Sequence, residues 1–325
     1  MGFNHDGDLE LAKSYLKKLA RLGVDCLKFQ LFRPDRLLSQ QVGDEVKNIF
    51  RQHHLSTEDY LELVSLAAEL DIEIAASVFD PETLNWYVQN TSPPFLKIAS
   101  GDITYRRLLE AAGETGVPVV LSTGAATRKE IDRALEWLRP AKKIILLLCQ
   151  PQYPAAEHKL NLRRIKTLAD NFNRPVGFSD HSQSELAPAV AAHFGACFWE
   201  RHVTTDNSRP GPEHSFSLPL ADFARLSENI PHTVKRLTEE IISRLAGSGQ
   251  PPKPGDWSDY RLNARRSLAA AHQLEVDEKL TPDAVVELRP ATGLPPAEIY
   301  DYLGAAVKTP LEAGEIITAS HLNFP

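Results

Sequence analysis

Two histidines stand at the ends of consecutive apolar segments of the chain. His181 closes the segment 175–181 and His202 closes the segment 196–202, with one helical pattern at 184–194 between them. Consecutive parallel strands bring their carboxyl ends side by side, which is where α/β folds carry their chemistry. Two neutral imidazoles there suit a divalent first-row metal ion that keeps open positions for substrate and water. Either histidine alone would also be explained as a polar residue at a strand end, but the repeated placement favours the metal site.

Two lysines lie inside segments that are otherwise apolar. An unpaired charge is costly there, so Lys28 and Lys97 are either paired, used for binding, or buried only along their aliphatic stems. Hydroxyl groups follow the ends of neighbouring segments at Ser100, Ser122 and Tyr153. Hydroxyls and backbone amides around two cations predict a binding site for a phosphate or a carboxylate.

Alternating strands and helices have to position these residues. Apolar residues at helical spacing predict a first helix at 8–22 with Asp8 as its N-cap, and the segment 24–31 is typical of a strand. Further strands are predicted at 72–79, 95–100, 117–122, 143–149, 175–181 and 196–202, and further helices at 57–69, 82–88, 106–114, 128–138, 162–171, 184–194 and 220–244. This alternation predicts an α/β fold, a TIM (β/α)8-type barrel that lacks its first strand, with an open doubly wound sheet as the alternative.

The composition changes after the last predicted helix, which indicates a second domain. We assign residues 1–245 to the barrel and residues 246–260, which are rich in Gly, Ser and Pro, to a linker. Short apolar runs separated by turns predict a small β-rich domain at 261–325.

The charge, the apolar segments and the cysteines of the chain predict which partners it binds and where in the cell it is located. The 325-residue chain has a net charge of −7 and no basic run, so nucleic acid is not an expected partner. No apolar segment has the length of a membrane span and no signal peptide is recognisable, which predicts a cytoplasmic protein. Cys26, Cys149 and Cys197 fall in apolar segments and are predicted to be buried free thiols, as in a reducing compartment.

A set of short motifs, taken together and in this order, resembles the sialic acid (N-acetylneuraminate) synthase family. In the barrel they are 2–8, 27–30, 96–102, 121–124, 153–155, 177–181, 200–202 and 210–214. The segments 265–268 and 289–290 are similar to the antifreeze-like (SAF) domain of that family. The resemblance covers essentially the whole chain.

The resemblance implies a metal-dependent condensation of phosphoenolpyruvate with an N-acylated amino-hexose, such as N-acetylmannosamine or a related bacterial sugar. The products would be a nonulosonic (sialic-type) acid and phosphate. His181 and His202 would hold the divalent ion, typically Mn²⁺, with Mg²⁺ or Co²⁺ as other candidates. The residues implied in catalysis are Glu213, Lys28 and Lys97; those implied in substrate binding are Lys28, Gln30, Lys97, Ser100, Ser122, Tyr153, Ser179, Glu213 and Arg289.

In the family, Arg289 would reach the sugar from the small domain of another subunit, which implies a domain-swapped homodimer. Two departures from the family pattern favour an alternative. Met1 stands where the family has a Glu at the end of the first strand, an appearance that a start assigned too late would also produce, and Pro151 removes one hydrogen bond to phosphoenolpyruvate. The alternative is a catalytically impaired or sugar-binding relative; an eight-carbon keto-acid synthase on the same barrel is disfavoured by the SAF-like segment.

Overall fold

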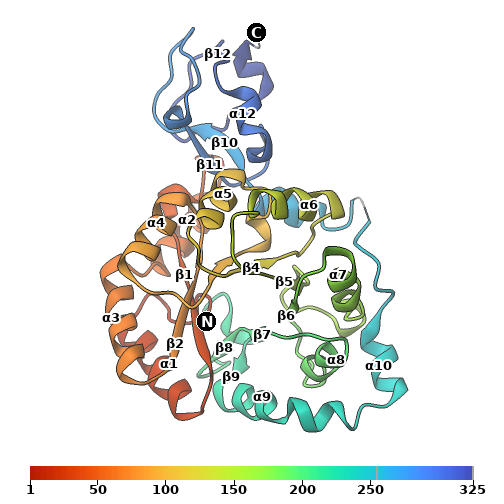
Figure 1. Cartoon of the computed structure of the whole chain (residues 1–325). Coiled ribbons are helices and arrows are strands. Elements are labelled where there is room, and N and C mark those ends of the chain that lie inside the picture. The colour runs from red at the N-terminus through yellow and green to blue at the C-terminus, as the bar shows by residue number, and fades with distance from the viewer. Residues whose placement is uncertain (254, 324–325) are drawn as a thin grey trace.

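Parallel strands and covering helices alternate along most of the chain in the computed structural model, which describes residues 1–253 and 255–323 (Figure 1). Within these residues one curled sheet has seven strands in the order β1 to β7, and every neighbouring pair is parallel. The strands are β1 (Cys26–Leu31), β2 (Glu73–Val78), β3 (Leu96–Ile98), β4 (Val119–Ser122), β5 (Ile144–Cys149), β6 (Val176–Asp180) and β7 (Trp199–Arg201). The predicted TIM-type barrel without a first strand is therefore confirmed.

Helices cover the outside of the sheet, and the predicted ones are present except that the segment predicted as one helix at 220–244 forms two, α9 and α10. They are α1 (Leu9–Arg21), α3 (Thr57–Glu69), α4 (Pro81–Asn90), α5 (Arg106–Glu114), α6 (Arg128–Trp137), α7 (Arg164–Phe172), α8 (Ala187–His193), α9 (Leu220–Val234) and α10 (Glu239–Ala246). Asp8 caps α1, as expected, by accepting hydrogen bonds from the amides of Glu10 and Leu11 at 2.8 and 3.1 Å. Helix α2 (Asp44–Gln52) was not predicted; it buries no side chain fully and packs only Ile49 and Phe50 against a small apolar cluster.

Alternation along β1 decides which side chains point into the barrel. Leu27, Phe29 and Leu31 are buried and belong to the core between sheet and helices. Lys28 and Gln30 have the opposite parity and face the barrel interior, because successive side chains of a strand point to opposite faces. The register then aligns Lys28 with Ala75, and Ser77 with Lys97, so interior side chains from three strands meet.

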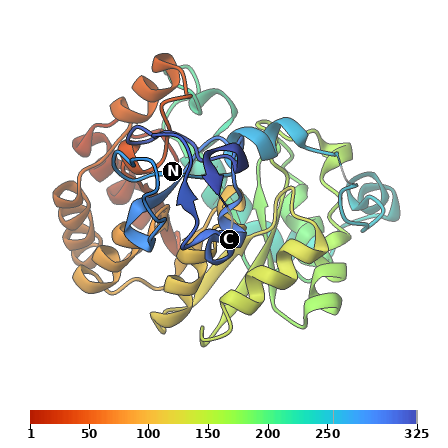
Figure 2. The ribbon, with the colours of Figure 1, turned by 90° about the horizontal axis from the view of Figure 1, so that it is seen from above.

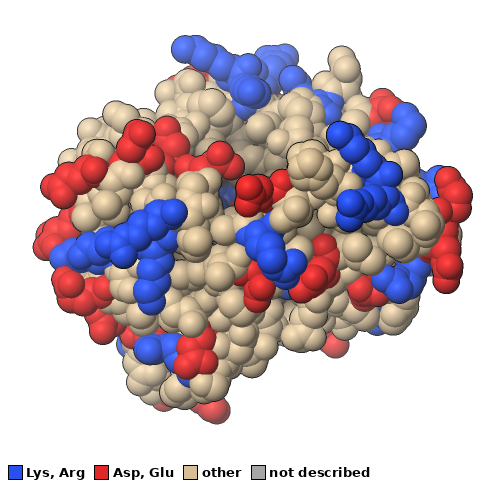
Figure 3. Space-filling view, turned by 90° about the horizontal axis from the view of Figure 1, so that it is seen from below, with Lys and Arg blue, Asp and Glu red and all other residues tan. Residues whose placement is uncertain are grey.

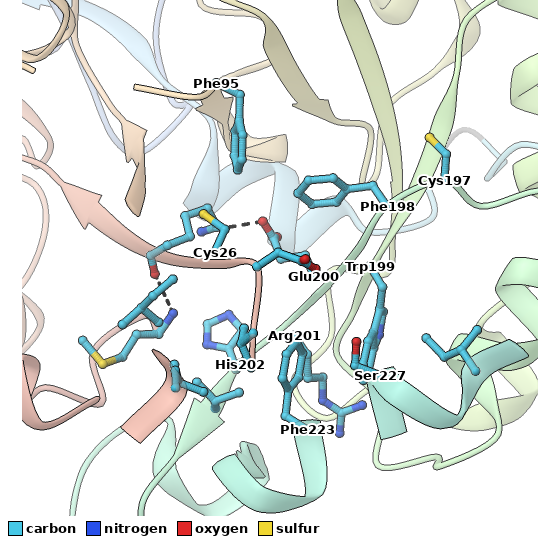
Figure 4. A pocket seen from close by; sticks show the side chains of 18 residues that line it. Cys26, Phe95, Cys197, Phe198, Trp199, Glu200, Arg201, His202, Phe223 and Ser227 are labelled. Atoms are coloured by element: carbon cyan, nitrogen blue, oxygen red, sulfur yellow. Dashed lines mark hydrogen bonds and ion pairs between the residues drawn. The ribbon is translucent and has the colours of Figure 1, made fainter. Parts of the chain in front are cut away.

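The sheet does not close on itself within the described residues, because β1 and β7 are its edges. A cavity lies between them, with Cys26 on one side and Phe198 and Trp199 on the other (Figure 4). The amino group of Met1 reaches into this region and donates a 2.7 Å hydrogen bond to the carbonyl oxygen of Lys28. That bond has the form of a ladder bond to the open edge of β1.

The small domain has its own core and lies over the barrel (Figure 2). Strands β10 (Ser267–Ala270) and β11 (Val285–Leu288) are antiparallel, as are β12 (Ala306–Val307) and β13 (Leu322–Asn323). Helix α11 (Ser258–Ala264) precedes β10, and α12 (Ile299–Tyr302) lies between β11 and β12. Charged pairs hold the domain to the barrel: Arg266 donates to Asp102 at 2.6 Å and Arg107 donates to Glu287 at 2.6 Å.

Acidic and basic side chains are interspersed over the face opposite the small domain (Figure 3).

The burial of the thiols differs in part from expectation. All three cysteines are free, but only Cys149 is buried; Cys26 is half-buried and Cys197 is exposed. The prediction of three buried thiols was wrong because Cys197 precedes β7 instead of lying within it. No helix in the described ranges is long and apolar enough to cross a membrane.

An extended segment fused ahead of Met1 should pair with the open edges of β1 and β7. We expect an extension of about six residues, alternating apolar and polar, to stabilise the protein. Burying its apolar side chains in the cavity should raise the free energy of unfolding by roughly 2 kcal/mol. Urea unfolding measures this change, with a Gly/Ser extension of the same length as control. Equal stability of the two extended proteins would contradict the prediction.

The same extension tests the buried amino group, which it replaces with a neutral amide. Burial, and then the charge of Lys28, lower the pKa of the Met1 amino group from 8.0 to about 5. Between these pH values the unfolded chain binds more protons at this group, so its contribution to stability increases with pH. We expect the free energy of unfolding of the extended protein to rise less between pH 5 and pH 8, because the contribution of the amino group is gone. Urea unfolding at several pH values measures this rise.

Candidate active site

Lys28 and Lys97 share one carboxylate inside the barrel. Glu200 on β7 places its Oε2 3.7 Å from Lys28 Nζ and its Oε1 3.6 Å from Lys97 Nζ. Lys28 also donates to Ser77 Oγ at 3.2 Å, and Lys97 donates to Ser122 Oγ at 2.9 Å. Ser179 donates to Glu200 at 2.8 Å. We call these six side chains the lysine cluster: Lys28, Ser77, Lys97, Ser122, Ser179 and Glu200.

The charges of the lysine cluster depend on one another. Burial, and then repulsion by Lys28, lower the pKa of Lys97, while Glu200 acts in the opposite direction. Burial alone would raise the pKa of Glu200, but the two lysines and the Ser179 hydroxyl together hold it below its usual value. Two cations and one anion leave the cluster with an excess positive charge, which suits an anionic ligand.

Ser77 and Glu200 are the two members of this cluster that were not predicted as site residues. Glu200 lies within the motif at 200–202. The signal for a role was its spacing of two from His202, because residues two apart on a strand share a face.

The two predicted metal-binding histidines lie next to each other, with ring centroids 5.8 Å apart and planes at 73°. The Nδ1–H of His181 donates to the carbonyl oxygen of Gln150 at 2.6 Å. His202 Nδ1 lies 3.1 Å from a carboxylate oxygen of Glu213, which fixes the same tautomer. Both rings therefore have Nε2 available as a ligand, an arrangement typical of metal-binding histidines.

The donor set is compatible with one shared divalent ion. With metal–nitrogen bonds of about 2.1 Å, two imidazoles on one ion have ring centroids up to roughly 6.5 Å apart. Burial, and then His202, lower the pKa of His181 to about 3, so its imidazole is neutral near pH 7. In the described ranges no group of three or more His, Cys, Asp and Glu side chains could hold a metal, so water or substrate would have to supply further ligands.

Glu213 is held against His202 by the N-terminal loop. The amide of Phe3 donates to the same carboxylate oxygen at 2.7 Å. Burial would raise the pKa of Glu213, but His202 and the Phe3 amide outweigh it and lower the pKa to about 2. The loop is anchored in turn by Asn4, whose amide donates to Val203 O and Ser217 Oγ, both at 2.8 Å. Glu213 is therefore an ionised hydrogen-bond acceptor at neutral pH.

Tyr153 lies between the two histidines and the solvent. Its ring stacks on His181 with centroids 3.9 Å apart and lies edge-on to His202 at 5.5 Å. It remains 45% exposed, so it covers the imidazoles without sealing them. Ser179 Oγ lies 3.4 Å from His181 Nε2 and links the histidines to the lysine cluster.

The remaining predicted residues are Ser100, Arg289 and Gln30. Ser100 Oγ is 2.6 Å from the hydroxyl of Tyr260 on α11. Arg289 lies 3.7 Å from Asp102 of its own chain, and its Nε is buried without a hydrogen-bond partner. Gln30 faces the interior opposite Ser77. The structure thus brings the lysines, Ser122 and Ser179 into one group and the histidines, Glu213 and Tyr153 into a second, adjacent one, whereas Ser100 and Arg289 contact Tyr260 and Asp102.

Comparison with known proteins identifies the family. The profile of the NeuB family matches residues 15–241, and that of the SAF domain matches residues 265–323. The chain belongs to the NeuB family. The N,N'-diacetyllegionaminic acid synthase of Legionella pneumophila is 32% identical, over 99% of this chain and 92% of that protein. The predicted family resemblance, and with it the expectation of an enzyme of this kind, is confirmed.

Solved structures agree with this assignment. The spore coat polysaccharide biosynthesis protein spsE of Bacillus subtilis has a TM-score of 0.85 and 27% identity, covering 100% of this chain and 94% of that chain. The N-acetylneuraminic acid synthetase of Leptospira borgpetersenii, solved with citrate, has a TM-score of 0.68 and 31% identity, covering 80% of this chain and 88% of that one.

Gly2 should tolerate no side chain, because its φ is +62° and a Cβ would overlap Glu213 Oε2 and lie 2.7 Å from His202. We expect Gly2→Ala to separate Glu213 from His202 and to lower the free energy of unfolding by about 2 kcal/mol. Gly23→Ala is the matched control, since Gly23 has a φ of +67° with open space around it. Urea unfolding that shows the same loss for both variants would refute the steric argument.

Glu200→Gln should leave the two lysines without their counter-charge. Breaking a buried ion pair from one side costs about 3–5 kcal/mol, so we expect a large fall in thermal stability. Phosphoenolpyruvate should restore more stability to this variant than to the wild type, because its anionic groups replace the missing charge. Thermal melts with and without the ligand measure this. Glu62→Gln, which breaks an exposed pair with Lys13, should change little.

Proposed function

We propose that this protein condenses phosphoenolpyruvate with an N-acylated amino-hexose to form a nonulosonic acid and phosphate. The observation that carries this proposal is the lysine cluster lying directly beside the imidazoles of His181 and His202, and joined to His181 through Ser179. The first group suits the phosphate and carboxylate of an enol phosphate, and the second lies where the sugar carbonyl would be activated. The relatives named as legionaminic acid and N-acetylneuraminic acid synthases support the assignment.

The reaction joins C3 of phosphoenolpyruvate to the aldehyde carbon of the sugar. Water adds at C2 of the former enol, the C2–O bond to phosphate breaks, and inorganic phosphate leaves with that electron pair. Lys28 and Lys97 hold the anionic groups throughout. Ser77 orients Lys28, Ser122 orients Lys97 and Ser179 orients Glu200. Tyr153 and the small domain limit access of water to the reacting carbons.

A divalent ion, which we propose to be Mn²⁺, would be held by His181 and His202 and would polarise the sugar carbonyl as a Lewis acid. Glu213 keeps His202 in the tautomer that leaves Nε2 free. Glu213 and Arg289 are proposed to contact the sugar: Glu213 is in hydrogen-bond contact with His202, and Arg289 lies beside Asp102 with its Nε unpartnered.

Release of inorganic phosphate tests the function. We expect release when phosphoenolpyruvate, Mn²⁺ and either N-acetylmannosamine or a di-N-acetylated hexose are supplied together, and its loss on adding EDTA. Omitting the sugar should abolish release, which separates the condensation from simple hydrolysis. Sugar binding by calorimetry without phosphate release from any combination would instead favour the catalytically impaired relative.

We also propose a homodimer in which the small domains are exchanged. Arg289 lies on the barrel of its own chain, and exchanging identical domains between two protomers would form the same contacts between chains. Refolding the inactive Lys97→Gln and Arg289→Gln proteins together, so that mixed dimers can form, distinguishes a dimer with exchanged small domains from one without exchange. Exchange should rebuild one intact site per mixed dimer and recover activity, whereas a site formed within one chain would recover none.

A further inference from the structure

Arg164, at the start of α7, is a buried arginine without a partner. Its side chain is only 6% exposed, and no carboxylate, carbonyl or hydroxyl oxygen of the described residues pairs with it. The other deeply buried arginines differ in this respect. Arg201 pairs with Asp180 at 2.7 Å, Arg266 pairs with Asp102 at 2.6 Å, and Arg265 pairs with Glu130. Arg164 thus has no counter-charge among the described residues, and its guanidinium nitrogens are not fully enclosed.

The Arg164 side chain lines a cavity of about 500 Å³. One wall is formed by Thr123, Cys149 and Gln150, at the carboxyl ends of β4 and β5, and the other by Ser248, residues 250–253, Asp256 and Trp257. Lys159 and Lys253 also line the cavity. None of its lining residues belongs to the lysine cluster, so it is a separate site on the same side of the barrel.

The charges around the cavity favour an anion. Arg164, Lys159 and Lys253 are opposed by a single lining carboxylate, Asp256, which accepts a 2.8 Å hydrogen bond from the backbone amide of Lys253. Burial alone lowers the pKa of Arg164 to about 10, with no carboxylate acting against it. A buried charge is costly unless it is paired, so an incoming anion would relieve a penalty that is present in the free protein.

We propose that this cavity binds a phosphate-bearing small molecule through a two-pronged contact with Arg164. The planar guanidinium matches two oxygens of a phosphate, and Lys159 and Lys253 add charge at the rim. The cavity is within the size range of small-molecule sites, so it has room for an organic phosphate as well as for free phosphate. The proposal stands on binding alone and does not depend on the condensation reaction.

Titration calorimetry of the full-length protein with inorganic phosphate tests the site. We expect Arg164→Gln to weaken the phosphate affinity by about tenfold or more. Lys166→Gln is the matched control, because it removes one positive charge from the same helix at an exposed position. Lys97→Gln should retain the binding, which separates this site from the lysine cluster. Because the lysine cluster would also bind phosphate, the decisive comparison is made in Lys97→Gln: binding there that is unchanged by adding Arg164→Gln, or binding that is lost in Lys97→Gln alone, would overturn the proposal.

Thermal melts test the same site, because the effect of Arg164→Gln on stability should differ without and with phosphate. Without phosphate, Arg164→Gln should be at least as stable as the wild type, because it removes an unpaired buried charge. With phosphate, Lys97→Gln should gain stability and the double variant Lys97→Gln/Arg164→Gln should not. If Arg164→Gln fails to fold even without phosphate, Arg164 is structural and the proposal falls. Arg164→Lys keeps the charge but not the planar fork, so it should bind phosphate more weakly than the wild type.

Competition with a hexose 6-phosphate identifies the source of the phosphate group. Tighter binding than inorganic phosphate, lost in Arg164→Gln, would assign the cavity to a phosphorylated sugar. Equal or weaker binding would assign it to free phosphate. Binding of the sugar phosphate that is unaffected by Arg164→Gln would count against the site.

Discussion

The electrostatic balance around Glu200 is the constraint on which the rest of the barrel interior depends. Two lysines inside a barrel would repel each other and lose their charges, and a carboxylate between them keeps both available for an anion. The serines contributed by β2, β4 and β6 then fix the positions of these groups. The polar interior is therefore a set of mutually dependent charges whose arrangement is set by the register of neighbouring strands.

The fold and much of the site could be predicted from the chain because both follow from simple periodicities. Alternation within β1 separates Lys28 from the buried Leu27 and Phe29, and the parallel order of strands brings His181 beside His202. The chemistry of those residue types then indicates an anion site and a metal site. Local pattern was sufficient because each of these side chains belongs to, or directly follows, a regular strand.

Features that depend on distant contacts were not predictable in this way. Glu200 becomes important only because three strands place Lys28 and Lys97 around it. The contact between Glu213 and the Phe3 amide joins residues 210 positions apart. The position of Arg289 over its own barrel results from contacts between domains, which no local pattern encodes.

The buried pair between Asp102 and Arg266 has a consequence for how the molecule melts. Asp102 belongs to the barrel and Arg266 to the small domain, and both side chains are almost completely enclosed. Pulling the domains apart would break this pair together with the hydrogen bonds that Arg266 donates to the carbonyl oxygens of Arg36 and Phe79, so undocking removes contacts that both parts share. Heating should consequently denature both parts in a single cooperative transition.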